Sequence, residues 1–232
     1  MILNILTTAT PRPNIHQKTL EPWFRTLYKS KIFNRINWFV NLDKPSMFSA
    51  KDFLLAKKYL HKNFYFVNRY YSERLQNPTF ALASRNVYVN CNDTIDRSKK
   101  NYFMWLEDDW IIDAPAIEHI KNYIESEKDI INLNAKQRVT GNPCIFNQNF
   151  FDGCFDVIKK GDTDPEMAMM YMSYVIYPDM IRTVASPRDN LPDRVVYNPG
   201  VRLVHDVGVG WKKRKGIIKT SKFIVQQDTW IS

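Results

Sequence analysis

The chain has 232 residues, of which 44% are hydrophobic and 25% charged, so it can bury one substantial core and is neither disordered nor collagen-like. Its formal net charge of +9 favours anionic partners such as nucleic acid, an anionic membrane face or phosphate-bearing substrates. The three cysteines lack CxxC spacing and suggest neither a disulfide framework nor a zinc site, which fits a reducing, cytoplasmic compartment. No apolar run approaches the roughly 20 residues of a membrane span, so a soluble protein with at most peripheral membrane contact is expected.

Strand-like apolar runs alternate with helical patterns through the first half of the chain. The expected strands are residues 2–6, 36–42, 63–68 and 102–106, and the expected helices are residues 19–32, 49–62 and one that begins at residue 77. This alternation predicts an α/β protein with a parallel sheet and right-handed crossovers. The run at 102–106 is apolar throughout, which is typical of a parallel strand covered on both faces.

The second half is less regular. Its expected strands are residues 130–133, 144–146 and 201–204, its expected helices are residues 149–160 and 164–177, and Asn198-Pro199-Gly200 marks a turn. Neither an internal repeat nor a linker is evident. We therefore expect a single domain over residues 1–232, with a doubly wound half over 1–113 and an irregular half over 114–232.

Three adjacent carboxylates, Glu107-Asp108-Asp109, directly follow the apolar strand that ends at residue 106. Ligands of parallel α/β sheets bind outside the carboxyl ends of the strands. Adjacent carboxylates repel each other, so either water screens them in a solvated turn or a divalent cation compensates them in a cleft. The apolar residues on both sides of the triplet favour the cleft, where Mg²⁺ or Mn²⁺ takes carboxylate oxygens together with those of a diphosphate.

The segment MWLEDDW resembles the acidic DXD motif of GT-A glycosyltransferases, loosely like the small glycosyltransferase domains of large algal DNA viruses. The resemblance implies a Rossmann-like GT-A fold, a nucleotide-sugar donor bound by residues 1–113, an acceptor-binding and catalytic half, and Mn²⁺ or Mg²⁺ as cofactor. It also implies that Asp109 binds the metal directly, that Glu107 lies near the donor's ribose or sugar, and that Asp108 lies near the donor sugar. If the source is viral, the compartment is the host cytoplasm.

Other segments of the first half carry weaker parts of the same resemblance. The opening ILTTATPRP is similar to the family's nucleotide-binding start, which implies donor contacts from Thr8 and Arg12. Asp43, after the second expected strand, matches a position that often contacts the base. The pair Arg85-Asn86 resembles an Arg-Asn pair that lies near the nucleotide in many such enzymes.

In the second half, His205 within RLVHDVGVGW resembles the C-terminal histidine that completes the metal site in many GT-A enzymes. A single histidine is also common as a structural residue. The basic run 212–215 follows it, and Lys212 and Lys213 would then face the diphosphate leaving group. The alternative for this run is a solvated loop.

The acceptor side needs a proton acceptor, and Thr163-Asp164-Pro165-Glu166 precedes an apolar helical pattern. The segment is similar to the acidic pair that carries the base in inverting GT-A enzymes. Glu166 would then take the proton of the acceptor hydroxyl, beside Asp164 as helix cap or second acid. In the alternative, acids in a first helical turn simply complement the helix dipole.

The expected function is metal-dependent, inverting transfer of a sugar from a nucleotide-diphosphate sugar to the hydroxyl of a carbohydrate or glycan acceptor, with UDP as the default nucleotide and GDP or dTDP as alternatives. A sugar-1-phosphate nucleotidyltransferase is the second hypothesis, but the loop after the first strand lacks the glycines of that class. A basic nucleic-acid-binding protein is the third. No recognised nucleic-acid motif supports it, so no nucleic-acid partner is expected.

Overall fold

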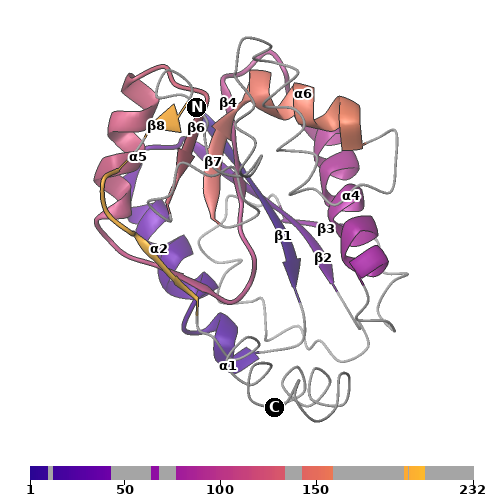
Figure 1. Ribbon diagram of the computed structural model, residues 1–232, viewed down its shortest axis with the longest axis horizontal. Helices are drawn as coiled ribbons and strands as arrows, with labels where there is room; N and C mark the ends of the chain where they lie inside the picture. The colour runs from indigo at the N-terminus through magenta and orange to yellow at the C-terminus, as the bar shows by residue number, and fades with distance from the viewer. Residues whose placement is uncertain are drawn as a thin grey trace, which may run out of the picture.

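The structure is a computed structural model that describes residues 1–9, 13–42, 64–67, 77–133, 143–158, 196–197 and 199–206. Strands and helices alternate through its first half (Figure 1). In chain order the elements are β1 (Ile2–Ala9), α1 (Pro13–His16), α2 (Leu20–Ser30), β2 (Arg35–Leu42), β3 (Phe64–Val67), α4 (Asn77–Thr94), β4 (Asn101–Trp105), β5 (Trp110–Ile112), α5 (Ala116–Glu125), β6 (Ile130–Asn132), β7 (Cys144–Asn147), α6 (Gln148–Ile158), β8 (Val196–Tyr197) and β9 (Val204–Asp206).

The expected strands and helices of the first half that fall on described residues are confirmed as β1, α2, β2, β3, α4 and β4, and those of the second half as β6, β7 and α6. The last strand covers Val204–Asp206 and not the expected residues 201–204, and a turn with Gly200 at φ 72° precedes it. Four elements, α1, β5, α5 and β8, were not predicted. The expected helices at 49–62 and 164–177 lie outside the described residues.

The main sheet has seven strands in the described part of the chain, in the order β3-β2-β1-β4-β7-β6-β8. The strands β3, β2, β1 and β4 are parallel to one another, whereas β7 runs antiparallel to both β4 and β6. The expected, mostly parallel sheet is therefore confirmed for β3, β2, β1 and β4 and interrupted by one reversed strand after β4.

Helices cover both faces of this sheet. Because successive side chains of a strand point to opposite faces, the apolar side chains are divided between two core clusters. On β4, Tyr102 and Met104 join the core cluster under α2 and α5, while Phe103 and Trp105 join the cluster under α4 and α6. All five residues of β4 are buried, which confirms that the apolar run is a strand covered on both faces. In Figure 1, α2 and α5 lie on one side of the strands and α4 and α6 on the other.

A row of buried asparagines crosses three neighbouring strands under α4. Asn37 Nδ2 on β2 donates to Asn4 Oδ1 on β1 at 2.7 Å, and Asn4 Nδ2 donates to Asn101 Oδ1 on β4 at 3.1 Å. Asn101 in turn donates to the carbonyl oxygens of Asp96 and Lys99 in the loop before β4. Because buried amides are costly unless they are hydrogen-bonded, the row stabilises this alignment of β2, β1 and β4.

The strand after the acidic triplet leaves the main sheet. β5 pairs antiparallel with β9 in a separate two-stranded sheet, and Ile112 and Val204 bury this pair against the core under α2 and α5. The chain segments at residues 110–112 and 204–206 are therefore fixed beside each other although they are distant in sequence. Among the described helices, none has the length and apolar character needed to cross a membrane.

Candidate active site

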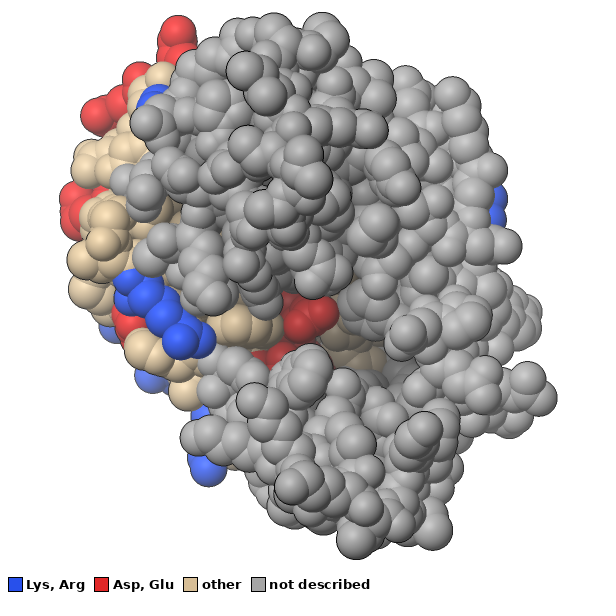
Figure 2. Space-filling view, viewed as in Figure 1, with Lys and Arg blue, Asp and Glu red and all other residues tan. Residues whose placement is uncertain are grey.

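The acidic triplet lies where the sequence predicts it, in a turn at the carboxyl end of β4. The amide of Leu106 donates to the carbonyl oxygen of Leu6 at 3.0 Å, so β4 stays paired with β1 up to the first acid. Glu107 and Asp109 are half-buried, whereas Asp108 is only 3% exposed. Figure 2 shows acidic side chains near the middle of the face that is seen in this view.

Asp108 turns inward, towards the segment that links β1 to α2. Its Oδ2 lies 2.8 Å from Nε2 of His16, and both side chains are 4% exposed. The hydroxyl of Thr19, which precedes α2, donates to the backbone oxygen of Asp108 at 2.7 Å. The resemblance implies that Asp108 lies near the donor sugar, and the structure shows its carboxylate buried against a histidine.

The side chain of Glu107 is hydrogen-bonded to a residue of the following strand. The indole Nε1 of Trp110 donates to Glu107 Oε2 at 3.3 Å, which ties the first acid to the beginning of β5. Thr8 is half-buried near the end of β1, where it pairs with Asn41 of β2, and β1 also pairs with β4. Thr8 and the triplet therefore share the carboxyl edge of the sheet.

The pairing of β5 with β9 places His205 on the strand beside β5, which begins directly after the triplet. His205 lies opposite Ile111 in the pairing of β9 with β5. Ile111 comes two residues after Asp109 and two residues before Asp113. Diagonal neighbours of this kind on one face of an antiparallel pair are within reach of long side chains. His205 Nε2 lies 2.8 Å from Asp113 Oδ2, and the His205 side chain is 56% exposed.

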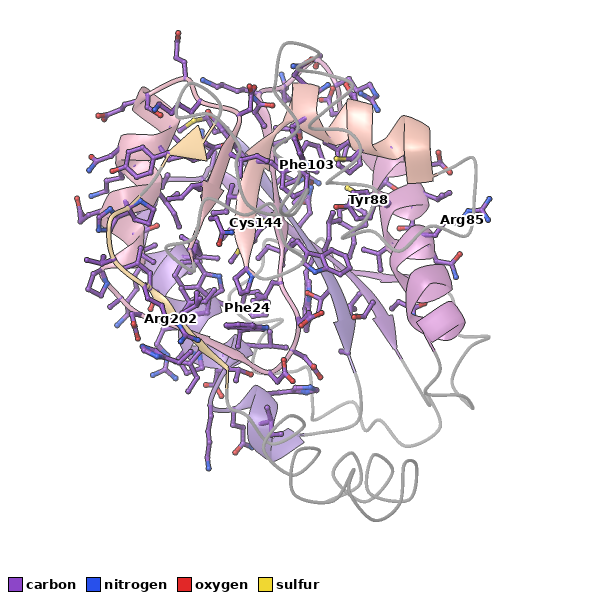
Figure 3. The ribbon with its side chains drawn as sticks, in the orientation of Figure 1. Phe24, Arg85, Tyr88, Phe103, Cys144 and Arg202 are labelled. Carbon is purple, nitrogen blue, oxygen red and sulfur yellow. The ribbon has the colours of Figure 1, made fainter. Side chains whose placement is uncertain are left out.

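The pair Arg85-Asn86 lies in the middle of α4, and both residues are half-buried. Figure 3 shows the labelled Arg85 side chain on the outer side of α4, pointing away from the strands. The proximity of this pair to a nucleotide stays a prediction. Six further predicted site residues lie outside the described residues, namely Arg12, Asp43, Asp164, Glu166, Lys212 and Lys213.

Asp109 and His205 supply the donor atoms that Mn²⁺ accepts, a carboxylate oxygen and an imidazole nitrogen. In the part of the chain that the structure describes, no group of three or more His, Cys, Asp or Glu side chains is placed to hold a metal ion.

Three residues of this edge were missed by the sequence analysis: His16, Thr19 and Asp113. Asp113 had a usable signal, because the run Trp110 to Ile112 is a short strand and alternation places 109, 111 and 113 on one side of it. His16 and Thr19 had none, since their contacts with Asp108 join residues 92 and 89 positions apart.

No protein-family model and no curated protein sequence matches this chain. Among solved structures, it is similar to S. aureus TarS residues 1–349, a GT-A glycosyltransferase, with a TM-score of 0.50 and 8% sequence identity. The likeness covers 74% of this chain and 55% of that TarS chain, so the matched region spans about half the length of the solved TarS chain. At this identity the match gives evidence on the fold alone, and it shows that the chain has a GT-A fold.

Proposed function

We propose that this protein transfers a sugar from a nucleotide-diphosphate sugar, with UDP as the first candidate, to a hydroxyl of a carbohydrate or glycan acceptor. The observation that carries the proposal is the position of the acidic triplet. Glu107 and Asp109 follow β4 at the carboxyl edge of a GT-A sheet, and β9, which carries His205, pairs with β5, the strand that begins directly after them. Ligands of open α/β sheets bind at this edge.

Asp109 and His205 would hold a divalent cation, Mn²⁺ or Mg²⁺. An Nε2–H that donates to Asp113 leaves Nδ1 of His205 as the nitrogen with a free lone pair. Carboxylates commonly orient metal-binding histidines in this way. When bound, such a cation supplies positive charge against the negative charge that develops on the departing nucleoside diphosphate.

The remaining donor contacts are proposed from the sequence resemblance and from the shared edge. Thr8 and Glu107 would meet the nucleoside and sugar side of the donor. Arg12, Asp43, Arg85, Asn86, Lys212 and Lys213 complete the proposed donor-binding set. The two lysines would add positive charge beside the diphosphate.

Glu166 is the proposed general base, with Asp164 beside it. It would accept the proton of the acceptor hydroxyl while the oxygen of that hydroxyl forms a bond to the anomeric carbon and the bond from that carbon to the phosphate oxygen breaks. Attack from the side opposite the leaving group gives inversion at the anomeric carbon.

Thermal unfolding with nucleoside diphosphates tests this function. A ligand present at 100 times its dissociation constant stabilises the native state by about 2.7 kcal/mol, and each kcal/mol moves the melting temperature of a domain of this size by about 2–4 °C. UDP with Mn²⁺ should therefore raise the melting temperature by roughly 5–11 °C, and by much less in EDTA. GDP and dTDP are tested in parallel to identify the base.

Two site variants and one matched control distinguish a defect in the proposed site from a general loss of stability. Asp109→Asn should remove the Mn²⁺-dependent part of the shift and abolish sugar transfer, and His205→Ala should reduce both. Asp152→Asn is the control, because Asp152 is a half-exposed acid on α6 whose carboxylate pairs with Arg97 at 2.6 Å. This control should keep the full shift. Equal shifts in Mn²⁺ and EDTA, or a full shift in Asp109→Asn, would contradict the metal-dependent site.

A further inference from the structure

The end of the sheet opposite the acidic triplet carries basic side chains that the proposed function does not use. The strands β2, β1 and β4 begin side by side at this end, because Ile2 pairs with both Arg35 and Asn101. The last turn of α2 and the loop before β4 lead into it. The exposed basic residues of these segments form what we call the basic edge, which consists of Lys29, Lys31, Arg35, Lys99 and Lys100.

Backbone hydrogen bonds fix the segments of the basic edge beside one another. The amide of Ile2 donates to the Lys100 oxygen, and the amide of Asn34 donates to the Met1 oxygen, both at 3.0 Å. Neighbouring strands lie about 4.8 Å apart, so the beginnings of β2 and β4 are separated by about 10 Å across β1. This spacing is similar to the Debye length of about 8 Å at physiological salt. The charges of the basic edge therefore act together on an approaching surface.

Nearby acids do not neutralise the basic edge. Within residues 29–35 and 96–100 the one acid is Asp96. Its Oδ1 accepts hydrogen bonds from the amide of Ser98 at 3.0 Å and from the hydroxyl of Ser98 at 2.7 Å. In the part of the chain that the structure describes, no carboxylate forms an ion pair with a side chain of the basic edge. The basic edge thus presents a net positive surface.

Two apolar side chains accompany these charges. Met1 is 37% and Tyr28 49% exposed, and Tyr28 lies in the last turn of α2 beside Lys29. Lysine and arginine are attracted to the headgroups of anionic lipids, and tyrosine is favoured where an apolar layer meets water. Single-stranded nucleic acid, in contrast, is usually bound on successive aromatic rings in a groove. Tyr28 is the one large aromatic side chain that the described residues expose, so the combination favours a membrane.

We propose that the basic edge is a docking surface for an anionic lipid bilayer. It is separate from the proposed active site, because β4 runs from Asn101 at the basic edge towards Glu107, and these two residues are about 20 Å apart. Figure 1 shows the N-terminus at one end of the sheet and the arrowheads of β1 and β2 at the other. Docking would turn the carboxyl edge away from the bilayer and leave it open to the aqueous side.

Vesicle sedimentation measures this docking with the full chain and needs neither donor nor metal. Binding to vesicles of phosphatidylcholine and phosphatidylserine is compared with binding to phosphatidylcholine alone. Lys99→Gln combined with Lys100→Gln should weaken binding to the mixed vesicles about 25-fold, because each basic residue near an anionic surface strengthens binding about fivefold. The control is Lys18→Gln combined with Lys121→Gln, which removes the same charge elsewhere, in the segment after α1 and on α5. This control should bind as the wild type does.

Two single variants separate the charge from the apolar contribution. Lys31 has a φ of 52°, a conformation that suits glycine, so Lys31→Gly should weaken vesicle binding about fivefold without lowering the melting temperature. Tyr28→Ser keeps the charge of the basic edge and should weaken binding several-fold. Lys31→Gly also serves as the test of charge if the double lysine variant does not fold.

Binding to mixed vesicles that the basic-edge variants weaken and the control does not supports the proposal. Equal binding to both kinds of vesicle, or equal losses in the basic-edge and control variants, would overturn it. Tighter binding to single-stranded RNA than to mixed vesicles, lost in the same variants, would assign the surface to nucleic acid instead.

The melting-temperature shift with UDP and Mn²⁺, measured on Lys99→Gln with Lys100→Gln, should equal that of the wild type. A smaller shift would connect these lysines to the proposed active site and overturn the separate surface. Failure of vesicle binding alone would leave the proposed function intact.

Discussion

Alkaline pH should destabilise this protein through two buried thiols. Cys91 on α4 and Cys154 on α6 are free cysteines with no exposed surface. Burial raises the pKa of both thiols well above the ordinary value, with the charge of Arg97 opposing this at Cys91 and that of Cys144 adding to it at Cys154. In the unfolded chain both thiols titrate near pH 8.5.

The sign and size of the effect follow from proton linkage. Above pH about 8.5 the unfolded chain releases protons that the folded protein keeps, so the stability present below this pH is lost as the pH rises. Between pH 8.5 and 9.5 the loss is about 1 kcal/mol for each thiol, or about 2 kcal/mol for both. That corresponds to a fall in melting temperature of roughly 4–8 °C.

The assay is thermal unfolding followed by circular dichroism from pH 7.5 to 9.5 under reducing conditions. The double variant Cys91→Ala with Cys154→Ala is the control. At pH 7.5 this variant should have a lower melting temperature than the wild type, because the substitutions leave small cavities. Between pH 8.5 and 9.5 its melting temperature should fall less than that of the wild type, by roughly 4–8 °C. An equal fall in both proteins would refute the reasoning and assign the alkaline loss to other groups.

Three further predictions concern the proposed site and its surroundings. Glu166→Gln keeps size and hydrogen bonding but removes the proton acceptor, so turnover should fall about 10²–10⁴-fold while UDP affinity, measured by calorimetry, changes little; an equal loss of UDP affinity would instead place Glu166 at the donor. Replacing Lys212 and Lys213 together by Ala should reduce the UDP shift of the melting temperature without removing its Mn²⁺ dependence, and an unchanged shift would make the basic run a solvated loop. Arg97→Ala breaks an ion pair with Asp152 whose side chains are 44% and 43% exposed, so the free energy of unfolding should change by less than about 1 kcal/mol in urea titration; a larger loss would show that this pair is structural.

The sequence alone determined the parallel half of the sheet and the position of the acidic triplet. A chain in which apolar runs of strand length alternate with amphipathic segments can adopt few folds, because parallel strands need crossover helices that cover both faces of the sheet. The same rule places Glu107 to Asp109 at the carboxyl edge, since the triplet directly follows the strand that became β4. These are short-range signals, and the structure confirms the strand and its burial on both faces.

Other local patterns in the sequence also correspond to features of the structure. Ala116, Ile117, Ile120 and Tyr123 recur at helical spacing, and all four are buried on α5. The three asparagines at positions 4, 37 and 101 interrupt apolar strands and would ordinarily mark exposed positions. Tertiary structure buries them together, because each amide on one strand finds its partner on the next.

Only the tertiary structure decided how the candidate site is assembled. The reversed strand β7 between β4 and β6, the pairing of β5 with β9, and the contacts of His16 with Asp108 and of His205 with Asp113 have no local signature. Both histidine–carboxylate contacts join residues 92 positions apart. The packing of whole helices and strands decides which distant residues meet. This packing depends on burial and loop closure over the entire chain and not on the pattern of any one segment.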